Sequence, residues 1–153
     1  MPTAPIVLGL IALTLGISLL ALWKGGPAER LGGAVVGANV VLSIISGLVL
    51  PLSAQSLARL TLDGLTALCL LVIAVRYASF WLGGVMLLYA AQFSLHAFYM
   101  VTSRPIDLLH IKINNVNFLL ISICLAVGTG VAWWQRTRRV GTATKSPAGP
   151  SKG

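Results

Sequence analysis

The sequence predicts an all-α integral membrane bundle of five transmembrane helices, with the N-terminus outside and the C-terminus inside. Of its 153 residues, 57% are hydrophobic and only 9% are charged, whereas globular domains are about 45–50% apolar and about 25% charged. A bilayer-spanning helix needs roughly 20 apolar residues. Four stretches without a charged residue reach that length, namely 1–23, 31–58, 77–103 and 113–135. This pattern excludes a soluble enzyme domain, a coiled coil, a disulfide scaffold and a disordered chain.

The first two helices are expected at about 4–23 and 31–50. No basic residue precedes the first, and its apolar run exceeds the roughly 7–15 residues of a signal-peptide core, so we expect it to be retained. Glycine, proline and three charges in the segment 24–30 predict a polar turn after it. Pro51 ends the second helix.

The third helix is expected at about 57–76 and is marginal in length, because the charge-free core between Asp63 and Arg76 is too short to span. If the helix begins near Leu57, Arg59 and Asp63 lie one turn apart. We expect these two to form an ion pair at the membrane edge. If this segment does not span, the chain has four spans.

The fourth and fifth helices are expected at about 80–102 and 116–134, with a polar connection between them that contains Asp107, His110 and Lys112. Residues 1–136 would then form the transmembrane domain. Residues 137–153 read as a flexible basic cytoplasmic tail, because they lack the apolar residues needed to fold alone. The tail is interpreted as a topology determinant or as a docking site for anionic lipid or a partner.

The basic residues behind the net charge of +8 lie between and after the apolar stretches. With the C-terminus inside, the inner side holds Lys24, Arg30, Arg76, Arg136, Arg138, Arg139, Lys145 and Lys152, and the outer side holds only Arg59, Arg104 and Lys112. The positive-inside rule favours this orientation. No basic patch with interleaved aromatic residues is present, so no nucleic-acid partner is expected. The expected partner is the lipid bilayer, together with another membrane protein or a second copy of this chain.

The fourth helix has one polar face. At about 100° per residue, Tyr89, Gln92, His96, Tyr99 and Ser103 project within a narrow arc. We expect this face to point into the bundle, because hydrocarbon offers its polar groups no partner. It could relay protons, bind a small polar solute or ligate haem, or it could supply only interhelical hydrogen bonds.

The second helix carries small residues suited to close packing. Gly33 and Gly37 form a GxxxG pattern with Gly47 on nearly the same face, and Asn39 and Ser43 lie beside them. Such a face marks a helix contact inside the bundle or an oligomer seam. Asn117, Cys124 and Gly128 align in the same way on the fifth helix.

Several short motifs resemble a group of small multi-pass proteins from alphaproteobacteria to which no activity is assigned. They are the 24–30 turn KGGPAER, Asp63-Gly64, Arg76, Phe80-Trp81-Leu82, and Gln92 followed by His96. The resemblance implies a bacterial inner membrane. It brings no functional residues with it.

The favoured function is a non-catalytic accessory or assembly protein, because the sequence has small-residue seams and few ionisable groups. No catalytic motif, metal pattern or cofactor site is found. One alternative is a small-solute transporter or channel along the polar face of the fourth helix. An ion-coupled pump is disfavoured there, because only His96 is expected at mid-membrane. A haem- or lipid-related membrane enzyme is the other alternative, although His96 and His110 are not expected to pair as haem ligands, since His110 is placed in a loop.

Overall fold

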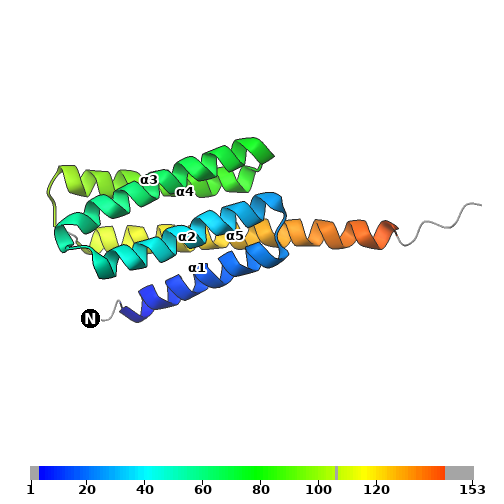
Figure 1. The fold of residues 1–153 in the computed structure, drawn as a ribbon, viewed down its shortest axis with the longest axis horizontal. Helices are drawn as coiled ribbons and strands as arrows, with labels where there is room; N and C mark the ends of the chain where they lie inside the picture. The colour runs from blue at the N-terminus through cyan, green and yellow to red at the C-terminus, as the bar shows by residue number, and fades with distance from the viewer. Residues whose placement is uncertain (1–3, 106, 144–153) are drawn as a thin grey trace, which may run out of the picture.

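The computed structural model describes residues 4–105 and 107–143, which form five α-helices joined by short turns (Figure 1). These are α1 (Ala4–Lys24), α2 (Pro27–Val49), α3 (Leu52–Tyr77), α4 (Phe80–Val101) and α5 (Leu108–Ala143). Each is long and apolar enough to cross a membrane, including the third segment, whose length the sequence left in question. The predicted all-α class with five helices of spanning length is therefore confirmed.

The outer surface of the bundle is apolar. Large hydrophobic side chains are exposed on every helix, among them Leu8, Leu48, Val75, Phe80, Val101 and Val127. A soluble monomer rarely exposes so much contiguous apolar surface. Such a surface is suited to apolar surroundings and suggests contact with a lipid bilayer.

Two helices begin earlier than the sequence predicts. The second starts at Pro27 rather than at Leu31, because proline is well suited to the first helical position, where its missing N–H is not needed. The third starts at Leu52 rather than at Leu57, directly after Pro51 at the N-cap. Proline therefore begins these helices as well as ending the segments before them.

The fifth helix is longer than predicted at both ends. It starts at Leu108 rather than at Val116, because the carboxylate of Asp107 accepts a hydrogen bond from the backbone N–H of His110 at 2.8 Å and caps the first turn. It also continues through Thr137 to Ala143, which the sequence assigned to the flexible tail. The rest of that predicted tail, 144–153, lies outside the described residues.

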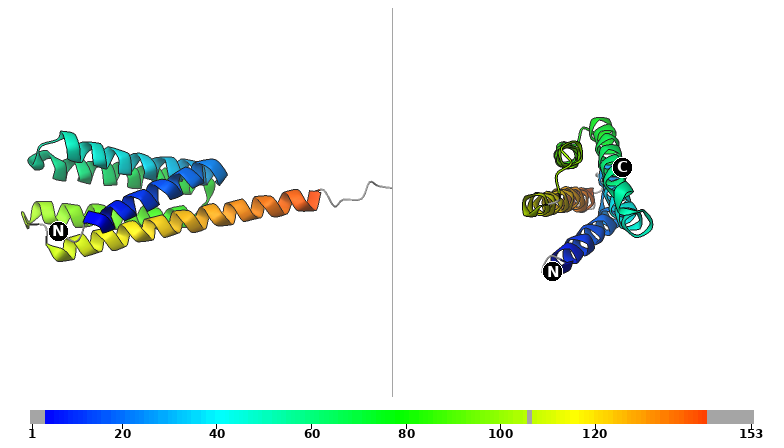
Figure 2. Two further views of the ribbon diagram at one scale, coloured as in Figure 1. Left: turned by 90° about the horizontal axis from the view of Figure 1, so that it is seen from below. Right: turned by 90° about the vertical axis from the view of Figure 1, so that its left-hand side faces the viewer.

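The helices are arranged as a ring. Each packs against the next in the chain, and α5 packs against α1 to close the circle (Figure 2). A buried hydrogen bond of 2.6 Å between Thr14 and Ser122 joins these last two helices. The α1–α2 and α3–α4 turns lie at one end of the bundle, here named the turn end, and the other two loops lie at the opposite loop end (Figure 1).

Apolar packing is concentrated towards the turn end. The buried cluster there draws on all five helices and consists of Ala21, Ala28, Val36, Leu70, Ile73, Leu82, Val85, Tyr89, Ile121 and Leu125. At this end the Trp81 side chain lies between α2 and α5. Its indole N–H donates a hydrogen bond to a Glu29 carboxylate oxygen at 3.2 Å, and its ring lies against Gly32 and Gly128. The ring of helices is thereby closed at the turn end.

The GxxxG pattern of α2 packs inside the chain. A Cβ added at Gly33 would lie 2.8 Å from the Ala21 Cβ of α1, and one added at Gly37 would lie 3.3 Å from the Ser18 Cβ. Gly47 has no such neighbour within 4 Å and does not belong to this contact. The two glycines therefore allow α1 and α2 to approach each other closely.

Gly128→Ala is expected to destabilise the bundle by about 1–3 kcal/mol, because the new methyl group would overlap the rigid Trp81 ring. The matched control is Gly130→Ala on the same helix, where nothing lies within 4 Å. There alanine should be neutral, or should add up to about 1 kcal/mol through helix propensity. Thermal unfolding in mild detergent measures both variants. Equal stability of the two would contradict the role of the Trp81 ring as a wedge packed between α2 and α5.

Candidate functional site

Asp63 of α3 is the centre of a buried polar cluster. Only 3% of the Asp63 surface is exposed. One carboxylate oxygen lies 2.8 Å from His96 Nδ1 of α4 and forms an ion pair with it when the imidazole is protonated. The other accepts a long hydrogen bond of 3.4 Å from the Asn39 amide of α2, which also donates to the Thr66 hydroxyl at 2.9 Å. The carboxylate thus joins three helices.

This arrangement differs from the expected Arg59–Asp63 pair at the membrane edge. Since α3 begins at Leu52, a rise of 1.5 Å per residue puts Asp63 about 16 Å from that end and about 21 Å from the Tyr77 end. Asp63 therefore lies near the middle of its helix, and its partner is His96 of the neighbouring helix. Arg59, one turn away, has no carboxylate within salt-bridge distance among the described residues.

His96 also contacts His110 of α5. The centroids of the two imidazole rings are 5.3 Å apart, and the rings are tilted by 35°. The sequence placed His110 in a loop, but the Asp107 cap brings it into the first turn of α5, where it is buried. Both histidines therefore lie inside the bundle and beside each other.

A second polar cluster links α4 to α5. The Gln92 amide donates to the Asn114 oxygen at 3.0 Å, and its own oxygen accepts a bond of 2.7 Å from the Asn117 amide. Asn117 also donates to the Leu88 carbonyl oxygen at 2.9 Å. Each amide oxygen or nitrogen used here pairs with a complementary group, as buried amides require.

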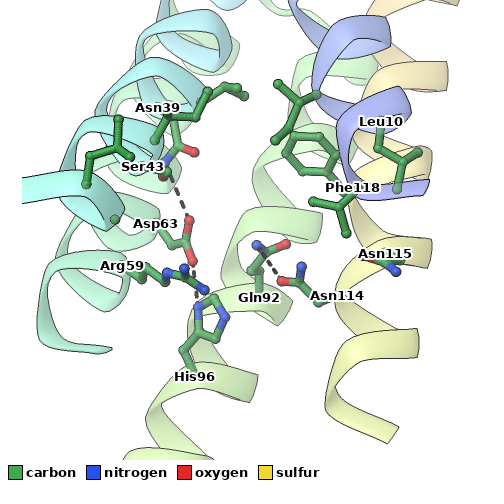
Figure 3. Close-up of a pocket in the computed structure, with 16 residues that line it drawn as sticks. Leu10, Asn39, Ser43, Arg59, Asp63, Gln92, His96, Asn114, Asn115 and Phe118 are labelled. Carbon is green, nitrogen blue, oxygen red and sulfur yellow. Dashed lines mark hydrogen bonds and ion pairs between the residues drawn. The ribbon is translucent and has the colours of Figure 1, made fainter. Parts of the chain in front are cut away.

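These clusters line a cavity of about 380 Å³ inside the ring, named here the polar cavity. All five helices contribute to its wall (Figure 3). The polar residues of its wall are Asn39, Ser43, Arg59, Asp63, Gln92, His96, Asn114 and Asn115, and its apolar residues include Leu10, Ile11, Val40 and Phe118. Figure 3 shows the Arg59 side chain extending along the wall towards Asp63 and His96.

A second cavity of about 480 Å³, named the vestibule, lies towards the loop end. Arg59 and His96 line both cavities. Tyr99, Arg104 and His110 also line the vestibule. At its rim the Tyr99 hydroxyl donates to the Asp107 carboxylate at 2.7 Å, and the Tyr99 ring packs edge-on against His110 at a centroid distance of 4.6 Å.

The predicted polar face of α4 therefore divides into three environments. Gln92 and His96 line the polar cavity, and Tyr99 lines the vestibule. Tyr89 lies in the apolar core, 1% exposed, and its hydroxyl has no hydrogen-bond partner among the described residues. Of the predicted packing residues on α2, Asn39, Ser43 and Gly47 line the polar cavity.

The sequence analysis placed Asn117 on the fifth helix but missed Asn114 and Asn115 as helical residues, and it missed the mid-helix position of Asp63. Asn114 lies three residues before Asn117 and extends the helical pattern of α5 upstream of Val116. An aspartate followed by apolar residues, as at Asp107, is an N-cap signal that would have moved the start of this helix. Among residues 4–105 and 107–143, no group of three or more His, Cys, Asp or Glu side chains is arranged to hold a metal ion.

Comparison of the chain with known protein families, with curated proteins and with solved structures gives no match. The resemblance to the alphaproteobacterial membrane proteins thus stays a prediction. Function has to be argued from the geometry of the two cavities.

The Asp107 cap predicts an acid-sensitive contribution to stability. Hydrogen bonds from the His110 backbone N–H and then from the Tyr99 hydroxyl lower the pKa of Asp107 below its ordinary value of 3.8. A carboxyl group with a lowered folded-state pKa stabilises the fold fully above its ordinary pKa, and this stabilisation is lost as pH falls through the lowered value. Asp107→Ala should therefore lower the melting temperature at pH 7.

The stability difference between wild type and Asp107→Ala should shrink as the pH falls below about 4, because the wild-type carboxyl group then becomes protonated as well. Asp107→Asn is the matched control, since its side-chain oxygen still caps the helix and does not titrate. Melting curves in detergent between pH 3 and pH 7 measure the effect. A stability difference independent of pH would contradict this role of the carboxylate.

Proposed function

We propose that this chain is a proton-linked carrier of a small polar solute in a bacterial inner membrane. The observation that carries the proposal is the Asp63–His96 pair, which is hydrogen-bonded at 2.8 Å in the wall of the polar cavity. Ionisable residues inside membrane helices are costly and commonly belong to proton relays or substrate pathways. A carboxylate and an imidazole in contact can exchange one proton between them.

A line of titratable side chains connects this pair with the loop end. His96 contacts His110, His110 contacts Tyr99, and Tyr99 is hydrogen-bonded to the exposed carboxylate of Asp107. Ring contacts rather than hydrogen bonds join His96 to His110 and His110 to Tyr99. All three side chains line the vestibule, however, where water can carry a proton to the Asp63–His96 pair. The line supports proton exchange with the aqueous phase at the loop end.

The asymmetry of the bundle supports a carrier rather than an open channel. The polar cavity and the vestibule lie towards the loop end, whereas buried apolar side chains and the Trp81 wedge close the turn end. Carriers expose their site to one side at a time. The structure has the form expected of one such state.

The two other hypotheses from the sequence find less support. The accessory-protein hypothesis drew on small-residue seams, few ionisable groups and the lack of a catalytic motif. Of these seams, Gly33 and Gly37 pack against α1 of the same chain and are not available to a partner. An enzyme would need a group to carry out chemistry beside the histidine. Among the described residues, His96 has Asp63 as its hydrogen-bond partner and no serine or cysteine hydrogen-bonded to it.

The proposed orientation has the loop end outside and the C-terminus inside. Lys24, Arg30, Arg76 and Arg136 would then lie on the cytoplasmic side, in agreement with the positive-inside rule. Trp133 would lie near the inner interface, as aromatic side chains commonly do. Polar solutes would enter the vestibule from outside.

Transport is tested with purified protein in liposomes under an imposed pH gradient. The probes are pyruvate, alanine, choline and sorbitol, which represent anionic, zwitterionic, cationic and neutral solutes. At least one should enter faster than into empty liposomes. Asp63→Asn and His96→Ala should each return that flux to the level of empty liposomes, because each removes one member of the proton-exchanging pair.

Thr61→Val and Ser94→Ala serve as matched controls on the same two helices. Both residues are exposed and bond only to carbonyl oxygens of their own helix, and neither lines the two cavities. Their flux should equal that of wild type. If no solute flux depends on Asp63 or His96 while both variants remain folded, the carrier proposal fails.

Orientation is tested with C-terminal fusions in a bacterial host. A green fluorescent protein fusion should be fluorescent and an alkaline phosphatase fusion inactive, because both report a cytoplasmic C-terminus. A second phosphatase fusion after Arg104, at the loop end, should be active. The reverse pattern would contradict the proposed orientation.

A further inference from the structure

We infer that the solute bound in the polar cavity is a small monocarboxylate with a short apolar portion, held by the Arg59 guanidinium and taken up together with one proton. This inference rests on the proposed carrier function. It assigns the chemical class of the ligand from the donors, the charges and the shape of the cavity.

The cavity has a cation without an acidic partner. Arg59 lines both cavities, and among the described residues its guanidinium forms no salt bridge. Asp63, the acidic residue in the polar-cavity wall, is already bonded to His96 and Asn39. A guanidinium presents paired N–H groups whose spacing matches the two oxygens of a carboxylate. Arg59 is thus available to a carboxylate that enters from the vestibule.

Hydrogen-bond donors predominate among the remaining free groups of the wall. The Asn114 oxygen is occupied by Gln92, which leaves the Asn114 amide N–H₂ to face a ligand. Asn115 on the same wall has an amide with no hydrogen bond to another described residue. The Asn39 amide nitrogen, in contrast, is bonded to Asp63 and Thr66, so this residue offers the cavity only its oxygen. A ligand rich in acceptor oxygens complements this set.

The charges favour one anion bound with one proton. Facing the site are Arg59 and Asp63 from α3, His96 from α4 and His110 from α5, while α1 and α2 contribute no charged or titratable side chain to the polar-cavity wall. When the Asp63–His96 pair holds one additional proton, the pair is neutral as a whole and the Arg59 guanidinium leaves the site with one net positive charge. One bound carboxylate then makes the site neutral, which low-dielectric surroundings favour.

Size and shape limit the rest of the ligand. Leu10, Ile11, Val40 and Phe118 contribute apolar surface to the cavity, and Figure 3 shows Leu10 and Phe118 across the cavity from Arg59 and Asp63. The volume of about 380 Å³ is near the lower end of the roughly 300–1,000 Å³ found for small-molecule sites. A short aliphatic or similar side group fits this apolar surface, whereas a long acyl chain exceeds the cavity.

Binding is measured by isothermal titration calorimetry of the full chain in mild detergent at pH 6. Hexanoate should bind, whereas hexanamide and hexylamine, which match its length but lack its negative charge, should bind at least about tenfold more weakly, as expected for loss of a charge-assisted pair. Titrations in buffers of different ionisation enthalpy should show uptake of about one proton per hexanoate.

Arg59→Gln should weaken hexanoate binding roughly tenfold or more, and Arg59→Lys should restore part of it through its point charge. Arg76→Gln, near the opposite end of the same helix and outside both cavities, is the matched control and should leave binding unchanged. Thermal unfolding of each variant shows that a loss of binding does not come from a loss of folding.

Three outcomes would overturn the inference. The first is equal or tighter binding of hexanamide or hexylamine, and the second is binding of palmitate or inorganic phosphate in place of hexanoate. The third is hexanoate binding that Arg59→Gln does not change. If a non-carboxylate solute instead shows flux that depends on Asp63 and His96, the carrier proposal stands and only the carboxylate assignment fails. If no flux depends on that pair, the carrier proposal itself fails.

Discussion

A carboxylate buried among apolar helices must be surrounded by hydrogen-bond donors, and this requirement organises half of the bundle. Asp63 receives its partners from α2 and α4, and His96 in turn lies against α5. An unpaired charge in such surroundings costs several kcal/mol. The helices near the loop end are therefore held together by polar contacts around one acid, whereas those near the turn end are held by apolar packing. The polar cavity lies where the first kind of packing replaces the second.

The two kinds of packing also differ in how they respond to change. Apolar side chains interdigitate at high density and resist displacement. The amide contacts of Gln92, Asn114 and Asn117 can each be exchanged for a contact with water or solute. Because the apolar packing at the turn end stays fixed while the polar contacts near the loop end can be exchanged, the bundle can bind a polar ligand without losing its fold. The Trp81 wedge, with its bond to Glu29, belongs to the fixed half.

Much of the fold could be predicted from the sequence, because the charge-free stretches and the 3.6-residue period reflect local constraints. The polar face with Gln92 and His96 was found in the same way. The helix starts at Pro27, Leu52 and Leu108 were missed, because proline and Asp107 were interpreted as breaks rather than as caps. The Asp63–His96 pair could not be found at all, since spacing along one helix carries no information on contacts between helices. The i, i+4 relation of Arg59 and Asp63 suggested a local partner where tertiary structure supplies a different one.

The length of α5 has a mechanical consequence. From Leu108 to Ala143 it contains no proline, so it behaves as one stiff rod roughly 54 Å long at 1.5 Å per residue. It contacts different parts of the bundle along its length, with Gly128 against Trp81 near its middle and His110 against His96 in its first turn. A small tilt of the rod about the Gly128–Trp81 contact would move His110 relative to His96 and leave the wedge in place. Trp81 would then act as the pivot and the histidine contact as the moving end, with no hinge required inside the helix.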